Sequence, residues 1–337
     1  MTTIYLIRHA EAEGNLYRLA HGQYNSNLTP RGYRQLSALR RRFLEVPIDA
    51  VYGSDLFRTY ATASAIFRPK QLEFRPLPLL REVCIGAWEG LSWAEIERLD
   101  RQMLIYFNQR LDLWHVDSGE TFDVVQDRMV EGIRQIAREC PNATVAATSH
   151  GAATRALLGR LMGLTLAECG ELPHGDNTSV TRLEVEGDAI RIAFHGDISH
   201  MPPELSTFRR QSWHKSGLAT EPGLWYTPLH SDAKSRSLQA MLGEEAAGQV
   251  AFHQEGDVMV VTDYQLAPAL RGRRFGAQLM GQAVQFARSC GCEAVTLTCG
   301  ADLAGYFAQF GFVETGRQGD SVALSLDIRL ILQEIPD

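Results

Sequence analysis

Five side chains with catalytic potential follow short apolar runs of this sequence or begin its amphipathic stretches. They are Arg8, His9, Arg58, Glu82 and His150. A short apolar run is typical of a buried parallel strand, and ligands of open α/β sheets bind where the carboxyl ends of such strands meet. We therefore expect these five side chains to lie close together at one edge of a sheet.

Two histidines, two arginines and one carboxylate suit the transfer of a phosphoryl group. A neutral imidazole can attack phosphorus in line, arginines neutralise the phosphoryl oxygens, and a carboxylic acid can protonate the leaving group. Such transfer depends on positioning and charge stabilisation, so we expect no metal ion at the site. Taken singly, a histidine after a strand or an arginine on a helix has an ordinary structural explanation. Only the combination points to catalysis.

The apolar pattern predicts the elements that hold these residues. Strands are expected at residues 3–7, 48–52 and 143–148 and as a hairpin at 180–185 and 189–194, and helices at 29–44, 55–67, 92–112, 120–139 and 152–162. Strands that alternate with helices in this way favour an α/β fold over a largely parallel sheet.

The length of 337 residues indicates about two domains. The pattern lapses between residues 202 and 223, where proline, serine and glycine become frequent. We predict an N-terminal domain at residues 1–205, a linker at 206–221 and a smaller C-terminal domain at 222–337. In the last of these, strands are expected at residues 224–229, 249–253, 258–266, 294–299 and near 322–328, and helices at 275–290 and 304–310.

Residues 1–205 resemble the histidine phosphatase superfamily (phosphoglycerate mutase-like). The shared motifs are Arg8-His9-Ala10-Glu11, Asn15, Leu28-Thr29 with Gly32 and Gln35, residues 54–62, Glu82 with Trp88-Glu89-Gly90, Ser149-His150-Gly151, Asn177-Thr178-Ser179 and residues 197–200. The resemblance implies a three-layer α/β/α domain. It also implies a metal-independent phosphomonoesterase that acts on a small phosphorylated metabolite.

The same resemblance assigns roles to the matching residues. His9 becomes the phosphorylated nucleophile, and Glu82 becomes the proton donor that later activates water as a base. The phosphoryl oxygens are assigned to Arg8, Asn15, Arg58 and His150. Ala10 replaces the commoner glycine, and Ala12 replaces the usual serine or threonine, which affects the expected substrate more than the chemistry.

A phosphoglycerate mutase is the alternative to a phosphatase. It would need extra cations for a substrate carboxylate, and the segment between residues 90 and 119 offers Arg98, Arg101 and Arg110. The short N-terminal domain favours the phosphatase, and the intact set of five residues disfavours a pseudoenzyme. Among the neighbouring residues, we expect surface charges for Glu11, Glu13 and Arg31 and core packing for most of Trp93, Tyr106, Phe107 and Trp114.

A second candidate site lies at residues 268–277, which follow a predicted strand and open a predicted helix. Backbone N–H groups at a helix N-terminus bind phosphate, and glycine allows close approach. The segment resembles the acyl-CoA pyrophosphate loop of the GNAT acetyltransferases. Arg271 and Gly276 match that loop, whereas Arg274 stands where its middle glycine is expected. Tyr306, followed by residues 311–312, is similar to the end of that family.

This second resemblance implies a smaller α+β domain with a mixed sheet that binds acetyl-CoA or another acyl-CoA. The pyrophosphate is assigned to Arg271, Gly272, Arg273, Arg274, Phe275, Gly276 and Ala277. Tyr306 would protonate the departing CoA thiolate, and Asp263 is only a candidate base. Three alternatives stay open: the domain transfers an acetyl group to an amine, binds acyl-CoA without transfer, or mediates homo-oligomerisation.

Composition narrows the class of partner. The net charge of −7 and the pI of about 5.8 argue against nucleic acid and anionic membranes as partners. Six scattered cysteines do not make a disulfide scaffold, and Cys290 and Cys292 have no second pair of cysteines or histidines nearby to complete a zinc site.

Without an export leader or a membrane-spanning stretch, we expect a cytoplasmic protein. Arginine makes up 30 of the 33 cations, and beyond the residues assigned above we attribute this excess to base composition.

Overall fold

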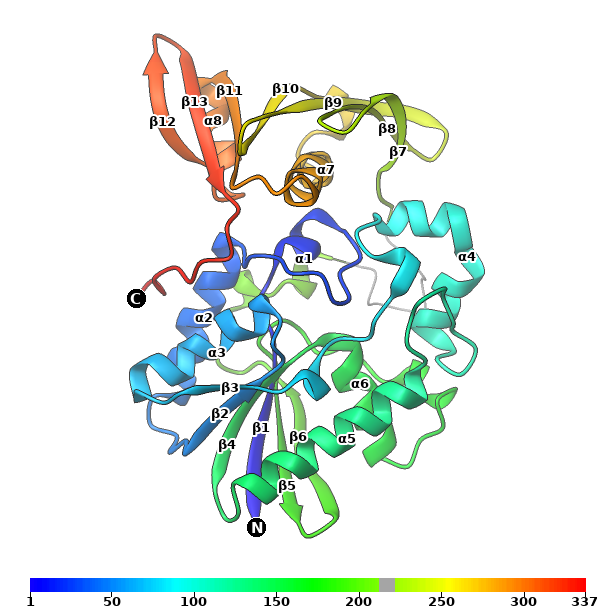
Figure 1. Cartoon of the computed structure of the whole chain (residues 1–337), viewed down its shortest axis with the longest axis vertical. Coiled ribbons are helices and arrows are strands. Elements are labelled where there is room, and N and C mark those ends of the chain that lie inside the picture. The colour runs from blue at the N-terminus through cyan, green and yellow to red at the C-terminus, as the bar shows by residue number, and fades with distance from the viewer. Residues whose placement is uncertain (212–221) are drawn as a thin grey trace.

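The N-terminal half of the chain is built on a six-stranded sheet (Figure 1). The computed structural model describes residues 1–211 and 222–337. The strands, in the order β3-β2-β4-β1-β5-β6, are β1 (Thr2–Arg8), β2 (Ala50–Gly53), β3 (Phe74–Pro76), β4 (Thr144–Ser149), β5 (Val180–Glu186) and β6 (Ala189–Asp197). The first four strands are parallel, and β5 and β6 add an antiparallel edge.

Helices cover both faces of this sheet because its strands present apolar side chains on both sides. One face carries α2 (Pro30–Phe43) and α3 (Phe57–Lys70), and the other carries α5 (Phe122–Glu139) and α6 (Gly151–Leu161). On β1, Ile7 packs into the core beneath α2 and α3, whereas Ile4 and Leu6 pack into the core beneath α5 and α6. The predicted three-layer α/β/α architecture is confirmed.

Two short elements and one helix kink of this half were not predicted. Helix α1 (Glu13–Tyr17) and strand β3 contain five and three residues, too few to display a period of 3.6 or 2. Helix α4 (Trp93–Gln109) is kinked at Asp100, whose φ of −152° is not helical.

The carboxyl ends of the parallel strands place the predicted catalytic residues. Arg8 ends β1 and is paired in register with Ser149, which ends β4. His9 and His150 follow directly, and His150 is the residue that caps the N-terminus of α6. Arg58 lies in the first turn of α3.

The C-terminal half is built on a mixed seven-stranded sheet, as expected. In the order β12-β13-β11-β10-β9-β8-β7, its strands are β7 (Trp225–Ser231), β8 (Ser235–Leu242), β9 (Glu245–Glu255), β10 (Val258–Leu266), β11 (Ala294–Gly300), β12 (Val313–Gln318) and β13 (Ser321–Asp327). Helices α7 (Phe275–Ser289) and α8 (Ala301–Ala308) accompany them. Neither β8 nor β12 was predicted. In β12 every residue is exposed, so its sequence lacks an apolar alternation.

Strands β10 and β11 form the parallel pair of this sheet, and they separate along their length. They pair only between residues 258–261 and 294–297. Beyond Val261 the register of β10 against β9 shifts, which indicates a bulge before Asp263. In the carboxyl-terminal part of β10, the side chain of Tyr264 reaches the first turn of α7 and donates to the Gly276 carbonyl at 2.6 Å.

Helix α1 of the N-terminal half packs against α7 of the C-terminal half (Figure 1). Tyr17 is 1% exposed and belongs to the hydrophobic core of the seven-stranded sheet. Gly281 makes room for it, since a Cβ there would lie 2.5 Å from the Tyr17 Cβ. The carboxylate of Glu13 accepts two hydrogen bonds from Arg288, at 2.7 and 3.0 Å. The expectation of a surface charge for Glu13 is therefore wrong, because α7 covers it.

The last residues of the chain return to the N-terminal half and run along α2 and α3 (Figure 1). Asn27 Nδ2 donates to the Arg329 carbonyl at 3.0 Å, and the Gln333 N–H donates to Tyr33 Oη at 3.3 Å. The division of the chain at residues 205 and 222 stays a prediction. Of the predicted linker, residues 212–221 lie outside the described residues, whereas residues 206–211 pack beside the end of β1.

Two further observations concern the described ranges. No helix within residues 1–211 or 222–337 is both long enough and apolar enough to span a membrane. All six cysteines are free thiols.

The contact between α1 and α7 predicts opposite effects for two glycine substitutions. Gly-to-Ala changes inside helices ordinarily stabilise by about 1 kcal/mol. We expect Gly281→Ala instead to lower the free energy of unfolding by about 1–3 kcal/mol, because its methyl group meets Tyr17. Gly305→Ala on α8 is the matched control, since a Cβ there meets open space. Urea unfolding of both variants tests this, and equal stability of the two would contradict the described packing.

Candidate active site

The five residues predicted for catalysis come together at the carboxyl edge of the six-stranded sheet. Arg8, His9 and Glu82 line one pocket, together with Asn15. Arg58 and His150 are fully buried next to it, and the ring centroids of His9 and His150 are 5.3 Å apart.

His9 is held in the form that a nucleophile requires. Its Nδ1 lies 2.8 Å from the Ala10 carbonyl oxygen. Because that oxygen can only accept, the proton sits on Nδ1 and the Nε2 lone pair is left for attack. Burial, reinforced by the charges of Arg58 and Arg8, lowers the pKa of His9 well below its usual value, so its ring is neutral at neutral pH.

Several buried nitrogen atoms near His9 have no hydrogen-bond partner among the described residues. They are Arg8 Nε, Arg58 Nε, His21 Nδ1 and both ring nitrogens of His150. A buried polar atom left unpaired costs about 1–3 kcal/mol, so such a cluster needs an explanation. A tetrahedral oxyanion would supply acceptors for donors on several sides at once.

Arg58 is fixed in place by backbone carbonyls of the loop that follows α1. Its Nη1 donates to the Tyr24 carbonyl at 3.0 Å, and its Nη2 donates to the Gly22 carbonyl at 2.6 Å. Burial lowers the pKa of Arg58 to about 10, which leaves the guanidinium charged at neutral pH. Arg8 is fixed in a similar way, by the Gly175 carbonyl at 2.5 Å and by the ring of Phe208, 5.3 Å from its guanidinium.

The carboxylate of Glu82 caps the first turn of α6. Its Oε1 accepts from the N–H groups of Val83 at 3.0 Å and Ala153 at 2.8 Å, and its Oε2 accepts from Ala152 at 3.1 Å. These bonds aim the carboxylate from the rim of the pocket. Oε2 accepts one recorded bond among the described residues, which leaves it a lone pair that can carry a proton.

Asn15 is positioned through its side-chain oxygen. Asn15 Oδ1 accepts from the Ala12 N–H at 3.1 Å and from Asn177 Nδ2 at 3.4 Å. Asn177 Nδ2 also donates to the His9 carbonyl at 2.8 Å. The amide nitrogen of Asn15 is thus the group that can donate to a ligand, and Asn177 positions both Asn15 and His9.

The structure adds a residue that the sequence analysis missed, His21. Its ring lines the pocket and stands perpendicular to His9, with centroids 5.7 Å apart. Burial and the charges of Arg58 and Arg8 lower its pKa well below the usual value. The ring sits over Gly14, where any Cβ would collide with it. The sequence carries little sign of this role, because His21 lies in a segment without a periodic apolar pattern and Gly14 alone marks the close contact.

The expected surface position of Glu11 is also wrong. Glu11 is 4% exposed and accepts from Thr29 Oγ1 at 2.7 Å and from Thr207 Oγ1 at 3.1 Å. Burial raises its pKa above the usual value. Arg31, half-buried, reaches it at 3.5 Å. Glu11 is covered because residues 203–210 fold back over the start of α2.

The wall of the pocket bears on the choice between phosphatase and mutase. Trp114 packs in the core as expected, whereas Trp93 and Phe107 also line the pocket. The three arginines considered for a mutase do not line it and are paired with carboxylates within the described residues. The pairs are Arg98 with Glu244 at 2.8 Å, Arg101 with Glu97 at 4.0 Å and Arg110 with Asp112 at 2.7 Å. The pocket has Arg18 and His174 in their place.

The predicted pyrophosphate loop lies at the first turn of α7. Arg274 adopts a φ of 65°, the left-handed conformation that glycine favours. The backbone shape expected of the loop is therefore present although the glycine is absent. No backbone hydrogen bond from the N–H groups of Gly272 and Arg273 is recorded within the described part of the chain.

Two tyrosines meet Gly276 beside this loop. Tyr264 Oη donates to the Gly276 carbonyl at 2.6 Å and lies 2.9 Å from Tyr306 Oη. Because the Tyr264 proton is committed to the carbonyl, Tyr306 donates to Tyr264. A Cβ at residue 276 would collide with Tyr306, so glycine is required there. Asp263 accepts hydrogen bonds from Gln249 and Gln265, the latter at 2.9 Å.

Neither site is built around a cluster of metal ligands. Across the described residues, no group of three or more His, Cys, Asp or Glu side chains is arranged to hold a metal ion.

Both halves match known protein families. Residues 4–198 match the sequence profile of the histidine phosphatase superfamily (branch 1), and residues 202–312 match that of the acetyltransferase (GNAT) family. A metal-independent phosphoserine phosphatase of Arabidopsis thaliana is 32% identical over 208 residues, which cover 60% of this chain and 84% of that protein. A probable phosphoglycerate mutase of Proteus mirabilis is 29% identical over 211 residues, which cover 60% and 95%.

Solved structures resemble the N-terminal half. YhfR of Bacillus stearothermophilus is 32% identical with a TM-score of 0.58, and the match covers 59% of this chain and 99% of that chain. A mycobacterial glucosyl-3-phosphoglycerate phosphatase solved with VO3 is 25% identical with a TM-score of 0.52, and the match covers 56% and 96%.

The placement of His21 yields a prediction for Gly14. We expect Gly14→Ala to displace the His21 ring and to lower kcat/KM for a phosphomonoester by about tenfold or more. The reason is that the unpaired Nδ1 of His21 would no longer face the pocket. His21→Ala should have a comparable effect, and the double variant should add little to either single change. Gly305→Ala is the control. Additive losses in the double variant would show that Gly14 acts independently of His21.

Proposed function

Because this chain belongs to the histidine phosphatase superfamily, we propose that it is a metal-independent phosphomonoesterase that works through a phosphohistidine at His9. The observation that carries this proposal is the set of buried, unpaired nitrogens around a neutral His9. Preorganised donors of this kind stabilise the charge that develops on phosphoryl oxygens.

In the proposed first step, the Nε2 lone pair of His9 attacks phosphorus and the bond to the leaving oxygen breaks. The guanidiniums of Arg8 and Arg58 and a ring N–H of His150 donate to the transferred oxygens, assisted by the Asn15 amide. Glu82 gives its proton to the leaving oxygen. In the second step Glu82 takes a proton from water, which attacks the phosphohistidine, releases phosphate and restores neutral His9.

For the substrate we propose a small phosphorylated metabolite with a charged carrier group, and phosphoserine is the first candidate. Two observations support it. The similar Arabidopsis protein is named a phosphoserine phosphatase. The pocket also combines the cation Arg18 and the imidazole of His174 with the apolar Leu19, Val83 and Ile85, a mixture suited to a short carboxylate-bearing molecule.

Phosphoglycerate mutase activity is the alternative, favoured by the likeness to probable phosphoglycerate mutases. The pairing of Arg98, Arg101 and Arg110 with carboxylates outside the pocket weighs against it. A hydrolase and a mutase differ in whether phosphate appears in solution.

For the C-terminal domain we propose acyl-CoA binding, with transfer of the acyl group to an amine as the full activity. Gly272 to Ala277 would hold the pyrophosphate at the first turn of α7, flanked by Arg271 and Arg273. The bound thioester supplies an activated acyl group. Tyr306 would turn its Oη proton from Tyr264 to the departing thiolate, and because burial raises its pKa above the usual value this proton is present at neutral pH.

His9→Ala tests the phosphatase proposal. We expect it to reduce hydrolysis of phosphoserine and of a generic aryl phosphate by about a thousandfold or more, because the covalent route is lost. His195→Ala is the matched control, on an exposed position of β6. Phosphate release that persists unchanged in His9→Ala would contradict the mechanism. Conversion of 3-phosphoglycerate by the native protein without phosphate release would replace the phosphatase by the mutase.

Calorimetry with acetyl-CoA tests the second proposal independently. We expect the native chain to bind, and Arg271→Ala combined with Arg273→Ala to bind about tenfold more weakly because two exposed cations are lost. Arg317→Ala, an exposed arginine on β12, is the control. Absence of binding by the native chain would refute the acyl-CoA proposal and leave the phosphatase proposal standing.

A further inference from the structure

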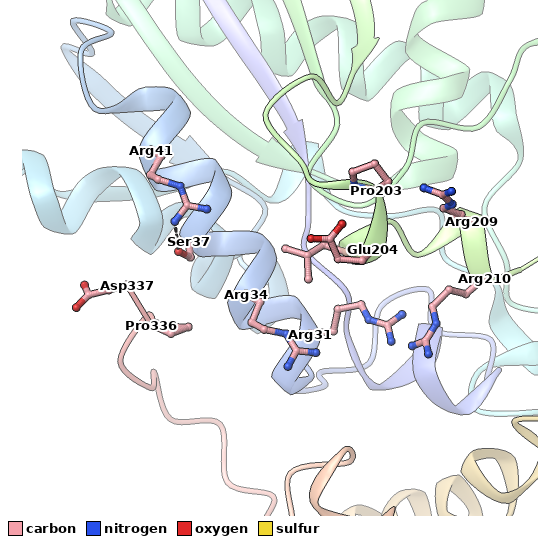
Figure 2. A pocket seen from close by; sticks show the side chains of 11 residues that line it. Arg31, Arg34, Ser37, Arg41, Pro203, Glu204, Arg209, Arg210, Pro336 and Asp337 are labelled. Carbon is pink, nitrogen blue, oxygen red and sulfur yellow. Dashed lines mark hydrogen bonds between the residues drawn. The ribbon is translucent and has the colours of Figure 1, made fainter. Parts of the chain in front are cut away.

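An open groove on the N-terminal half is lined by five arginines (Figure 2). Arg31, Arg34 and Arg41 come from α2, and Arg209 and Arg210 come from a single 3₁₀ turn at residues 208–210. The groove has a volume of about 800 Å³, which is the size of a small-molecule site and far more than one phosphate needs. None of the five arginines lines the pocket that holds His9.

The helical period explains why three arginines of α2 share this groove. Positions three and ten residues further along an α-helix lie about 60° and about 80° around its axis, so Arg31, Arg34 and Arg41 project on one side. The opposite side carries Leu36, Leu39 and Phe43 into the core. Figure 2 shows Arg31 and Arg34 reaching from α2 into the space that Arg210 enters from the other wall.

The positive charge of this groove is poorly balanced. Among the described residues, Arg34, Arg209 and Arg210 form no ion pair, and Arg41 donates only to Ser37 Oγ at 2.8 Å. Arg31 has only the 3.5 Å contact to Glu11, and its Nε is buried without a partner. Two carboxylates line the groove, Glu204 and Asp337.

One of these carboxylates is already engaged. Asp337 accepts from Arg40 at 3.1 Å, an arginine that does not line the groove. Four of the five guanidiniums thus form no ion pair among the described residues, and Glu204 is the uncommitted carboxylate of the groove lining, while the buried carboxylate of Glu11 pairs with Arg31 and also attracts Arg210. Like charges held together in this way repel one another unless an anion separates them.

A wall of hydrogen-bonded residues separates the groove from the catalytic pocket. Glu11 accepts from Thr29 Oγ1 and Thr207 Oγ1 between the two. The turn at residues 208–210 serves both sides, since Phe208 contacts Arg8 while Arg209 and Arg210 line the groove. A ligand in the groove therefore leaves the phosphoryl site at His9 open.

We propose that this groove binds a multivalent phosphate anion, the polyphosphate part of a small molecule, at a site separate from both the catalytic pocket and the α7 loop. One guanidinium group can bind two phosphate oxygens at once. Arginines on two facing walls therefore suit a chain of phosphates better than a single phosphate. With such a ligand, these five arginines have a function, and the base composition of the gene is no longer needed to explain their presence.

Calorimetry with sodium tripolyphosphate tests the proposal on the full chain. We expect Arg34→Glu combined with Arg210→Glu to raise the Kd at least about tenfold, because two exposed cations from opposite walls become anions. Arg138→Glu combined with Arg160→Glu makes the same change of net charge at exposed positions of α5 and α6 and should shift the Kd less than about twofold. The unfolding midpoint of each variant verifies that it is folded.

Three outcomes would overturn the proposal. The first is a Kd unchanged by the groove substitutions. The second is a Kd that rises as much in the control variant, since binding would then follow net charge alone. The third is orthophosphate binding as tightly as tripolyphosphate, which would remove the requirement for a chain of phosphates. A parallel titration with ATP distinguishes a nucleotide from an inorganic chain as the source of the phosphates.

Discussion

The structure around His9 is governed by a shortage of hydrogen-bond acceptors. Arg8, Arg58 and His150 carry buried nitrogens to which the described residues offer no acceptor, and burying them unpaired costs free energy. Backbone carbonyls hold the outer nitrogens of Arg58, so the side chain cannot turn away to relieve the shortage. An oxyanion beside His9 would complete the network. For such an anion these local donors would matter more than the overall charge of −7.

The two halves of the chain are joined through α1, the helix that precedes the loop with His21. Helix α1 begins four residues after His9 and ends at Tyr17, which is buried in the core of the other half. The helix that receives it, α7, starts at the predicted pyrophosphate loop. The ion pair of Glu13 with Arg288 adds a buried polar contact to this junction. Both candidate sites thus border one pair of packed helices, and substitutions at the contact bear on both.

Much of this arrangement could be predicted from sequence because parallel strands deliver their carboxyl ends to one edge. That rule, with the starts of the amphipathic stretches, predicted that Arg8, His9, Arg58, Glu82 and His150 lie close together. The family resemblance then assigned their roles. His21 escaped because it lies in a loop without period and owes its place to the missing side chain of Gly14. Glu11 and Glu13 were misjudged because distant segments cover them, residues 203–210 for one and α7 for the other. Strand β12 was missed because it is exposed throughout. For Glu11 and Glu13 the deciding contact lies far away along the chain, whereas His21 and β12 lack a periodic apolar pattern of their own.

A crystal structure of the full chain with orthovanadate tests the central claim most directly. The account predicts vanadium bonded to His9 Nε2, with vanadate oxygens within hydrogen-bond distance of Arg8, Arg58 and His150. The nitrogens that now lack acceptors would then be paired. Vanadate bound elsewhere, or a His9 ring free of it while those nitrogens stay unpaired, would contradict the account.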